Sequence, residues 1–217
     1  GDARYFFYDE GSAGRLFAPS DIPELPAEVQ AIFAGGISLV PDPCGATVEG
    51  FIRDHHARLP VMLDPNIRPF FIADAEAYRA RLGRLLPMAA IVKLSGDDLE
   101  WLYPGTRPAE AARRILALGP KLVLLTGGAA GATAHWSGAP VSAPAVRTRV
   151  ADTIGAGDTF NAGVLASLQR QGVLSHDGLA ALTPGQIEAA LTLGAQAAAV
   201  TVSRPGANPP WAHEMPA

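Results

Sequence analysis

The sequence predicts an α/β protein in which a mostly parallel sheet is covered by helices, and three observations support this class. Short β-type runs alternate with stretches of helical period along most of the chain. Each β-type run leads into a polar or glycine-containing turn. No low-complexity linker or internal repeat interrupts the alternation. We therefore expect one domain across residues 1–217.

Composition limits the classes of partner. The 217 residues are 48% hydrophobic and 18% charged, with a net charge of −4 and interspersed signs. This balance disfavours nucleic acids and anionic membranes as partners. The apolar runs are too short to cross a bilayer and no leader opens the chain, which predicts a cytoplasmic protein. Cys44 is the single cysteine, so an internal disulfide is not available.

Four runs carry the strand signal, and helical stretches separate them. Apolar residues at three- and four-residue spacing give each helical stretch one buried stripe. The expected strands are residues 31–40, 60–66, 89–95 and 121–128. The expected helices are residues 46–59, 76–86, 107–119, 158–172 and 183–202, the last shading into a strand.

Two other segments have β character. Residues 133–146 read as a hairpin with its turn at Ser137 and Gly138. The opening residues 3–17 have aromatic and small side chains without helical period, which suggests an extended pair at a sheet edge.

Candidate site residues follow the strands. In open parallel sheets, ligands bind outside the carboxyl ends of the strands, so polar residues placed there should share one face. The residues that lie just after a strand or at a helix start are Asp64, Asn66, Arg68, Ser95, Asp98, Thr126, Gly128 and Asp158.

The stretch "DTIGAGDTFNAG" is the sharpest signal. Gly155, Ala156 and Gly157 lead into a run of good helix formers. A helix start exposes unpaired N–H groups and a partial positive charge, so it can seat a phosphate. Asp158 could cap this helix. A carboxylate beside an anion seat is also what phosphoryl transfer to a hydroxyl requires.

This stretch resembles the second signature of the PfkB/ribokinase family of sugar kinases. The resemblance implies a ribokinase-like three-layer α/β/α sandwich with a mostly parallel central sheet and a small β lid, with residues 1–20 in the lid or sheet-edge region. It implies Asp158 as the base that deprotonates the sugar hydroxyl. It also implies that the amides of Gly155, Ala156 and Gly157 form the anion hole for the γ-phosphate of ATP.

The resemblance extends to nucleotide and sugar contacts. The "TGGAAG" segment is similar to the family's nucleotide loop, and "LDPNIRP" resembles an Asp-x-Asn-x-Arg segment that faces phosphate and sugar. Arg68 suits a phosphate, with a surface ion pair as its alternative. The implied ATP-binding residues are Asn66, Ser95, Thr126, Gly128, Gly131 and Ala195. The implied substrate-binding residues are Arg68, Asp158 and Phe7.

The resemblance also implies metal ions. "KLSGDD" is similar to a Lys-x-Asn-x-x-Glu segment whose acid holds Mg²⁺ through water, with Ser95 replacing Asn and Asp98 replacing Glu. N-capping of a helix is the alternative role for Asp98. A monovalent cation, K⁺ in relatives, would be held by Asp152 and by the residues Ile154, Val202 and Ala207.

The resemblance favours fructose as the sugar. Ketodeoxygluconate kinases of the family carry an arginine where alignment on "GSAG" places Asp9, so an acidic sugar is disfavoured unless Arg68 alone suffices to bind it. The tail and "DPNIRP" resemble bacterial fructokinases, which predicts conversion of D-fructose to fructose 6-phosphate. Ketodeoxygluconate kinase and ribokinase or nucleoside kinase activities are the alternatives within the family. Relatives often dimerise through the lid, which predicts a homodimer.

Two other classes of function compete with the kinase. A dinucleotide oxidoreductase is disfavoured because "GAGDTF" lacks the third fingerprint glycine and does not follow the first strand. A non-catalytic sugar- or nucleotide-binding protein is kept open by one departure from the family. PfkB kinases carry about a hundred further residues before the point that matches the start of this chain.

Overall fold

The structure is a computed structural model that describes residues 8–215. The described residues form two compact units, one within residues 6–124 and one within residues 125–217. The organisation as one domain stays a prediction. Among the described residues, no helix has the length and hydropathy needed to span a bilayer.

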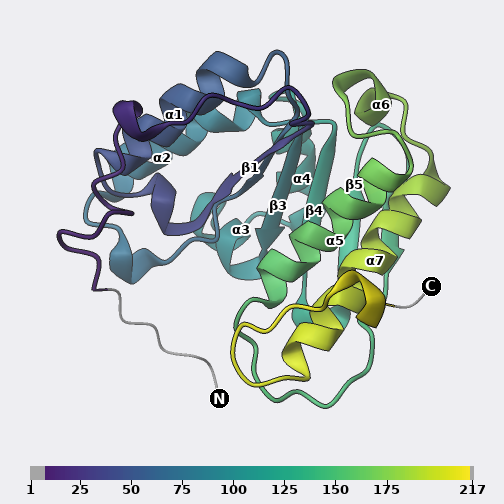
Figure 1. The fold of residues 1–217 in the computed structure, drawn as a ribbon. Helices are drawn as coiled ribbons and strands as arrows, with labels where there is room; N and C mark the ends of the chain where they lie inside the picture. Colours follow the sequence, from purple (N-terminus) through teal and green to yellow (C-terminus); the bar gives the residue numbers. More distant parts are fainter. Residues whose placement is uncertain (1–7, 216–217) are drawn as a thin grey trace. The chain divides into compact units, whose positions relative to one another are not determined.

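The unit of residues 6–124 alternates strands and helices (Figure 1). β1 pairs in parallel with β2, and β2 pairs in parallel with β3, as the alternation predicted. The elements in chain order are η1 (Pro19–Asp21), β1 (Ile32–Gly35), η2 (Gly36–Leu39), α1 (Cys44–His55), β2 (Val61–Asp64), η3 (Pro69–Phe71), α2 (Ala75–Leu85), η4 (Leu86–Met88), β3 (Ile91–Ser95), α3 (Gly96–Leu102), α4 (Pro108–Leu116) and β4 (Leu122–Thr126), which reaches into the second unit.

The unit of residues 125–217 consists of a hairpin and a helical pair. β5 (Ala132–His135) and β6 (Val141–Ala143) are antiparallel, with Thr133 opposite Ser142. The predicted hairpin is therefore confirmed, although its connection spans residues 136–140. The other elements are η5 (Gly128–Ala130), α5 (Ala156–Arg170), α6 (His176–Ala180), α7 (Pro184–Val202) and η6 (Ala212–Glu214).

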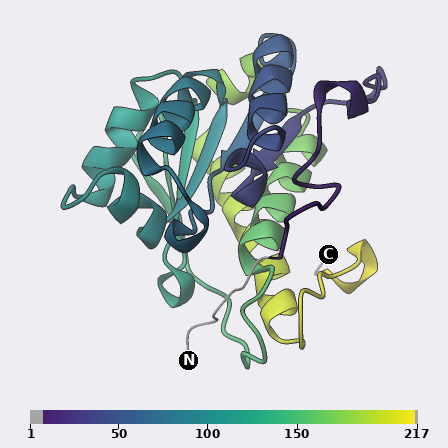
Figure 2. The same cartoon turned by 90° about the vertical axis from the view of Figure 1, so that its left-hand side faces the viewer.

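Helices α5 and α7 lie side by side in both views (Figures 1 and 2). They cross where two glycines meet. A Cβ atom on Gly163 would come within 2.7 Å of the Gly194 Cα atom, and one on Gly194 would come within 2.9 Å of the Phe160 carbonyl oxygen. Hydrogen at both positions is therefore what allows the two backbones to approach this closely.

Three sequence expectations about boundaries are wrong. Residues 37–40 do not continue the first strand, because Gly36 turns the chain with φ +63° into η2. The end of α7 does not become a strand, since Thr201 stays helical and donates to the Ala197 carbonyl one turn earlier. Residues 8–16 form turns rather than an extended strand, with Arg15 paired to Asp9 at 3.2 Å. The rest of the opening segment lies outside the described residues.

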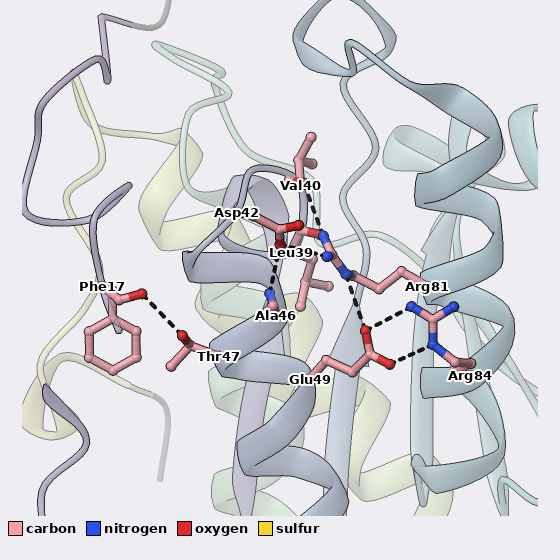
Figure 3. A network of polar contacts seen from close by, with 9 residues as sticks. All are labelled: Phe17, Leu39, Val40, Asp42, Ala46, Thr47, Glu49, Arg81 and Arg84. Atoms are coloured by element: carbon pink, nitrogen blue, oxygen red, sulfur yellow. Dashed lines mark hydrogen bonds and ion pairs between the residues drawn. The ribbon is translucent and has the colours of Figure 1, made fainter. Parts of the chain in front are cut away.

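A polar network holds α1, α2 and the turn that precedes α1 together (Figure 3). The Arg81 guanidinium on α2 donates to the carbonyls of Leu39 and Val40, both at 3.0 Å. It also donates to Asp42 at 2.6 Å and to Glu49 on α1 at 3.3 Å. These four hydrogen bonds reach segments distant in sequence, so Arg81 is a cross-link within the unit of residues 6–124.

Glu49 makes the stability of this network depend on pH. Hydrogen bonds from Arg84, with burial opposing them and Arg81 adding to them, lower the pKa of Glu49 below its usual range. A lowered pKa in the folded state means that the stabilisation is complete above the ordinary glutamate pKa of about 4.3 and disappears as pH falls through the folded value. We expect Glu49→Gln to reduce the free energy of unfolding by about 1–3 kcal/mol at pH 7.

The measurement is urea unfolding of both proteins from pH 7 to pH 3. The difference between wild type and Glu49→Gln should shrink as pH falls below the ordinary glutamate pKa of about 4.3, and it should disappear as pH passes through the lowered pKa of the folded state. Glu110→Gln is a matched control, because Glu110 pairs with Arg114 on an exposed helix face and should have a smaller effect. A difference that stays constant across the whole pH range would contradict the assignment.

Candidate active site

The loop after β2 is held in an uncommon conformation. Asn66 has φ +43°, in the left-handed region that asparagine tolerates better than most residues. Its N–H donates to Oδ1 of Asp64 at 3.2 Å. Arg68, half-buried, donates from Nη1 to the carbonyls of Asn66 and Ile67 at 3.4 and 3.1 Å. The guanidinium is thus fastened to the loop that carries it.

Asp98 lies at the start of α3, buried with 1% exposure. Its Oδ2 accepts from the N–H and the hydroxyl of Ser95 at 2.7 and 2.6 Å, and Ser95 Oγ accepts from the Asp98 N–H at 3.2 Å. This is the capping box of the alternative interpretation, now observed. Oδ1 of Asp98 accepts from the N–H of Ile67 at 2.6 Å. The roles of Asp98 toward Mg²⁺ and of Ser95 toward ATP stay predictions.

A buried ion pair underlies the same loop. Lys93 in β3 and Asp64 at the end of β2 approach to 3.0 Å, with side chains only 5% and 2% exposed. Sequence reasoning did not assign Lys93, although a lysine within the apolar run "AAIVKLS" was a signal that a buried partner exists.

Tyr78 on α2 contacts the loop from another direction. Its hydroxyl donates to the Pro65 carbonyl at 3.5 Å. Burial first, and then the nearby carboxylates of Asp98 and Asp64, raise the pKa of Tyr78 far above its ordinary value. The hydroxyl therefore keeps its proton and remains a donor.

In the unit of residues 125–217, the predicted nucleotide loop has left-handed backbone conformations at two of its glycines. Gly128 and Gly131 have φ +55° and +87°. The Gly127 N–H donates to the Gly131 carbonyl at 2.8 Å, and a side chain on Gly131 would collide with the Ala143 carbonyl. Thr126, half-buried, ends β4 just before this turn. Nucleotide binding here stays a prediction.

The start of α5 has a backbone geometry that suits an anion-binding helix N-terminus. Gly155 is the N-cap residue in the left-handed conformation, with φ +78°. The N–H of Ala156 reaches the Thr153 carbonyl at 3.4 Å, whereas the N–H groups of Gly157 and Asp158 have no acceptor among the described residues. A helix start with donors left over is a physical basis for anion binding.

The Asp158 side chain does not cap this helix. The start of α5 has no side-chain cap hydrogen bond. Asp158 is exposed, and its carboxylate has no hydrogen-bond or ion-pair partner among residues 8–215. The capping alternative is therefore not what the structure shows. The carboxylate is available to a ligand beside the first turn of α5.

Asp152 ties the loop before α5 to the loop after α7. Oδ1 accepts from the Ile154 N–H at 3.0 Å and Oδ2 from the Gly206 N–H at 2.9 Å. These bonds lower the pKa of Asp152, with the Ile154 bond as the larger cause. The Val202 carbonyl accepts from the Asp152 N–H at 3.2 Å, and Ala207 lies 3.3 Å from where a Gly155 Cβ would be. The residues predicted to hold a monovalent cation are thus neighbours, and the cation itself stays a prediction.

Two threonines that sequence reasoning missed support the α5 start. Thr159 Oγ1 donates to the Gly155 carbonyl at 2.6 Å, and Thr201 Oγ1 lies 2.9 Å from Thr159 Oγ1. Both side chains are buried, with Thr201 at 0% exposure. A threonine four residues after the helix-start glycine is the only local signal in the sequence.

For the remaining predicted residues, Ala195 and Phe7, the described part of the structure gives no contact that bears on their predicted roles. Ala195 is half-buried on α7, and its adenine contact stays a prediction. Phe7 lies outside the described residues. Within residues 8–215, no group of three or more His, Cys, Asp or Glu side chains could hold a metal ion.

In α/β proteins, the start of a helix that follows a glycine-rich turn is a common binding site for phosphate groups. The family model for pfkB family carbohydrate kinases matches residues 4–214, so the chain belongs to this family. A fructokinase from Rhizobium leguminosarum bv. trifolii is 44% identical over 84% of this chain and 56% of its own length. A 2-dehydro-3-deoxygluconokinase from Thermoproteus tenax is 31% identical over 80% of this chain and 53% of its own.

A solved structure extends the likeness to the fold. The crystal structure of a fructokinase with bound ATP from Xylella fastidiosa has a TM-score of 0.79 at 26% identity, covering 89% of this chain and 62% of that chain. This likeness confirms the predicted ribokinase-like α/β fold. The chain spans between half and two thirds of the length of these three proteins.

Proposed function

We propose that the protein is an ATP-dependent sugar kinase that transfers the γ-phosphate of ATP to a sugar hydroxyl. The observation that carries the proposal is the start of α5, where an exposed carboxylate without a partner lies beside N–H groups without acceptors. Membership of the pfkB family of carbohydrate kinases supports it independently.

The proposed mechanism uses the two parts of this helix start. The Asp158 carboxylate takes the proton of the sugar hydroxyl as its oxygen attacks the γ-phosphorus, and the bond to the leaving ADP oxygen breaks. The N–H groups of Gly155, Ala156 and Gly157 hold the transferring phosphoryl group. The Gly157 N–H has no acceptor among the described residues, whereas the Ala156 N–H would exchange its 3.4 Å bond to the Thr153 carbonyl for the phosphoryl group.

The nucleotide and metal assignments complete the proposal. Thr126, Gly128, Gly131, Asn66 and Ala195 would contact ATP, and Arg68 would contact phosphate or sugar. Bound Mg²⁺ would neutralise charge on the phosphate oxygens, which together with water supply most of its ligands in such sites. The monovalent cation near Asp152, the homodimer and the cytoplasmic location stay predictions.

D-fructose is the proposed substrate. The Rhizobium leguminosarum relative, at 44% identity, is a fructokinase. Asp9, at the position where an arginine would serve an acidic sugar, is already paired with Arg15 at 3.2 Å. That pair has no net positive charge, so recognition of an acidic sugar would depend on Arg68 alone. The Thermoproteus tenax relative keeps 2-keto-3-deoxygluconate as the second candidate.

The test is a coupled ADP-release assay on the protein expressed from its natural gene, with ATP and Mg²⁺. Fructose, ribose, 2-keto-3-deoxygluconate and adenosine are compared at equal concentration. We expect the highest kcat/KM with fructose. Faster turnover of the keto acid would replace the proposed substrate. If calorimetry shows that ATP binds in a sugar-dependent way, but no sugar leads to the formation of ADP, the non-catalytic alternative is favoured.

A further inference from the structure

The loop of residues 65–68 is held by two buried carboxylates that act in the same way. Each uses one oxygen for a backbone N–H of the loop: Asp64 holds Asn66 at 3.2 Å, and Asp98 holds Ile67 at 2.6 Å. These consecutive N–H groups lie immediately before Arg68.

The second oxygen of each carboxylate is held by β3. Oδ2 of Asp64 accepts from the Lys93 ammonium at 3.0 Å, and Oδ2 of Asp98 accepts from the N–H and hydroxyl of Ser95. Lys93 and Ser95 are two residues apart, so their side chains leave the same face of the strand. The loop is therefore attached to the carboxyl end of β3 through two acids.

Asp98 has little capacity left for anything else. It is 1% exposed, and its two oxygens already accept three hydrogen bonds from the chain. Mg²⁺ that is bound through water needs carboxylate oxygens that water can reach. The carboxylate instead has the environment of a structural anchor, in which charge-assisted bonds to N–H groups fix a backbone.

We propose that Asp98 is a positioning residue, which holds the loop of residues 65–68 so that Arg68 can meet a ligand phosphate, and that it does not contact Mg²⁺. This deepens the proposed kinase function and rests on it. It also replaces the magnesium role that the sequence resemblance implied for Asp98. Asn cannot substitute for this residue, because its amide nitrogen would face an N–H donor at one of the two sites.

The experiment compares Asp98→Asn with Asp97→Asn, which makes the same change at the neighbouring exposed acid. Amide hydrogen exchange at Asn66 and Ile67 should accelerate by at least tenfold in Asp98→Asn and stay unchanged in Asp97→Asn. In kinetic assays, Arg68→Ala should raise the KM of one substrate, and Asp98→Asn should raise the KM of that same substrate by about tenfold. The Mg²⁺ concentration that gives half-maximal rate should not move.

A double variant adds a readout that a general loss of stability would not give. If Asp98 acts through Arg68, Asp98→Asn adds little to Arg68→Ala, whereas independent effects would multiply. Should Asp98→Asn fail to fold, Ser95→Ala removes the hydroxyl bond to the same carboxylate and is measured instead.

Other outcomes decide against the proposal. Unchanged exchange at Asn66 and Ile67 would overturn it, and so would a tenfold or larger shift in the Mg²⁺ requirement without a change in KM. If the wild-type protein phosphorylates no sugar, the proposed function fails. The exchange measurement still shows whether Asp98 holds the loop.

Discussion

Replacing Asp158 with Asn is expected to lower the turnover of the sugar kinase reaction by roughly two to four powers of ten. The amide has nearly the same shape but cannot accept the hydroxyl proton. Because the Asp158 carboxylate makes no hydrogen bond or ion pair with the described residues, its replacement should leave the fold intact.

The measurement is steady-state kinetics with the preferred sugar, together with ATP binding by calorimetry. The affinity for ATP should change little, because the proposed anion hole consists of backbone N–H groups that the substitution keeps. Asp177→Asn is the matched control: Asp177 is an exposed acid in the first turn of α6, within the same unit. If Asp158→Asn keeps more than a tenth of the wild-type turnover, Asp158 is not the base.

Replacing Lys93 with Met is expected to reduce the free energy of unfolding by about 3–5 kcal/mol. The substitution keeps most of the side-chain volume but removes the ammonium that lies 3.0 Å from the buried Asp64 carboxylate. Asp64 keeps the bond from the Asn66 N–H, but the loss of a cation from a buried carboxylate costs far more stability than the loss of an exposed ion pair.

Urea unfolding of Lys93→Met and of a Lys93→Met, Asp64→Asn double variant separates charge from packing. Asn at position 64 is neutral and can still accept from the Asn66 N–H, so the double variant should recover much of the lost stability. A double variant as unstable as Lys93→Met alone would attribute the loss to packing around the methionine.

The sequence predicted elements whose signal is local. The apolar runs at β2, β3 and β4 and the helical stripe of α2 lie where expected. The expectation failed where one residue or a distant partner decides the outcome. Gly36 turns the chain within an apolar run, and Thr201, β-branched and strand-like in preference, stays helical with a buried bond to Thr159.

The same distinction applies to the candidate site. The glycines at 128, 131 and 155 could be recognised because a left-handed backbone conformation favours glycine at these positions. The role of Asp98 could not, since an acid three residues after Ser95 is equally suited to a cap and to a metal. The bond from the Ile67 N–H, which lies 31 residues away in the sequence, is the observation that favours the proposed positioning role.

The close crossing of α5 and α7 limits how this helix start can vary. Gly163 lies two turns after the proposed anion hole on the same rigid helix, so added bulk at Gly163 or Gly194 would tilt the whole of α5. A tilt of a few degrees is enough to displace the donors at its first turn. Substitutions that never touch a ligand could therefore weaken phosphate affinity through helix orientation alone.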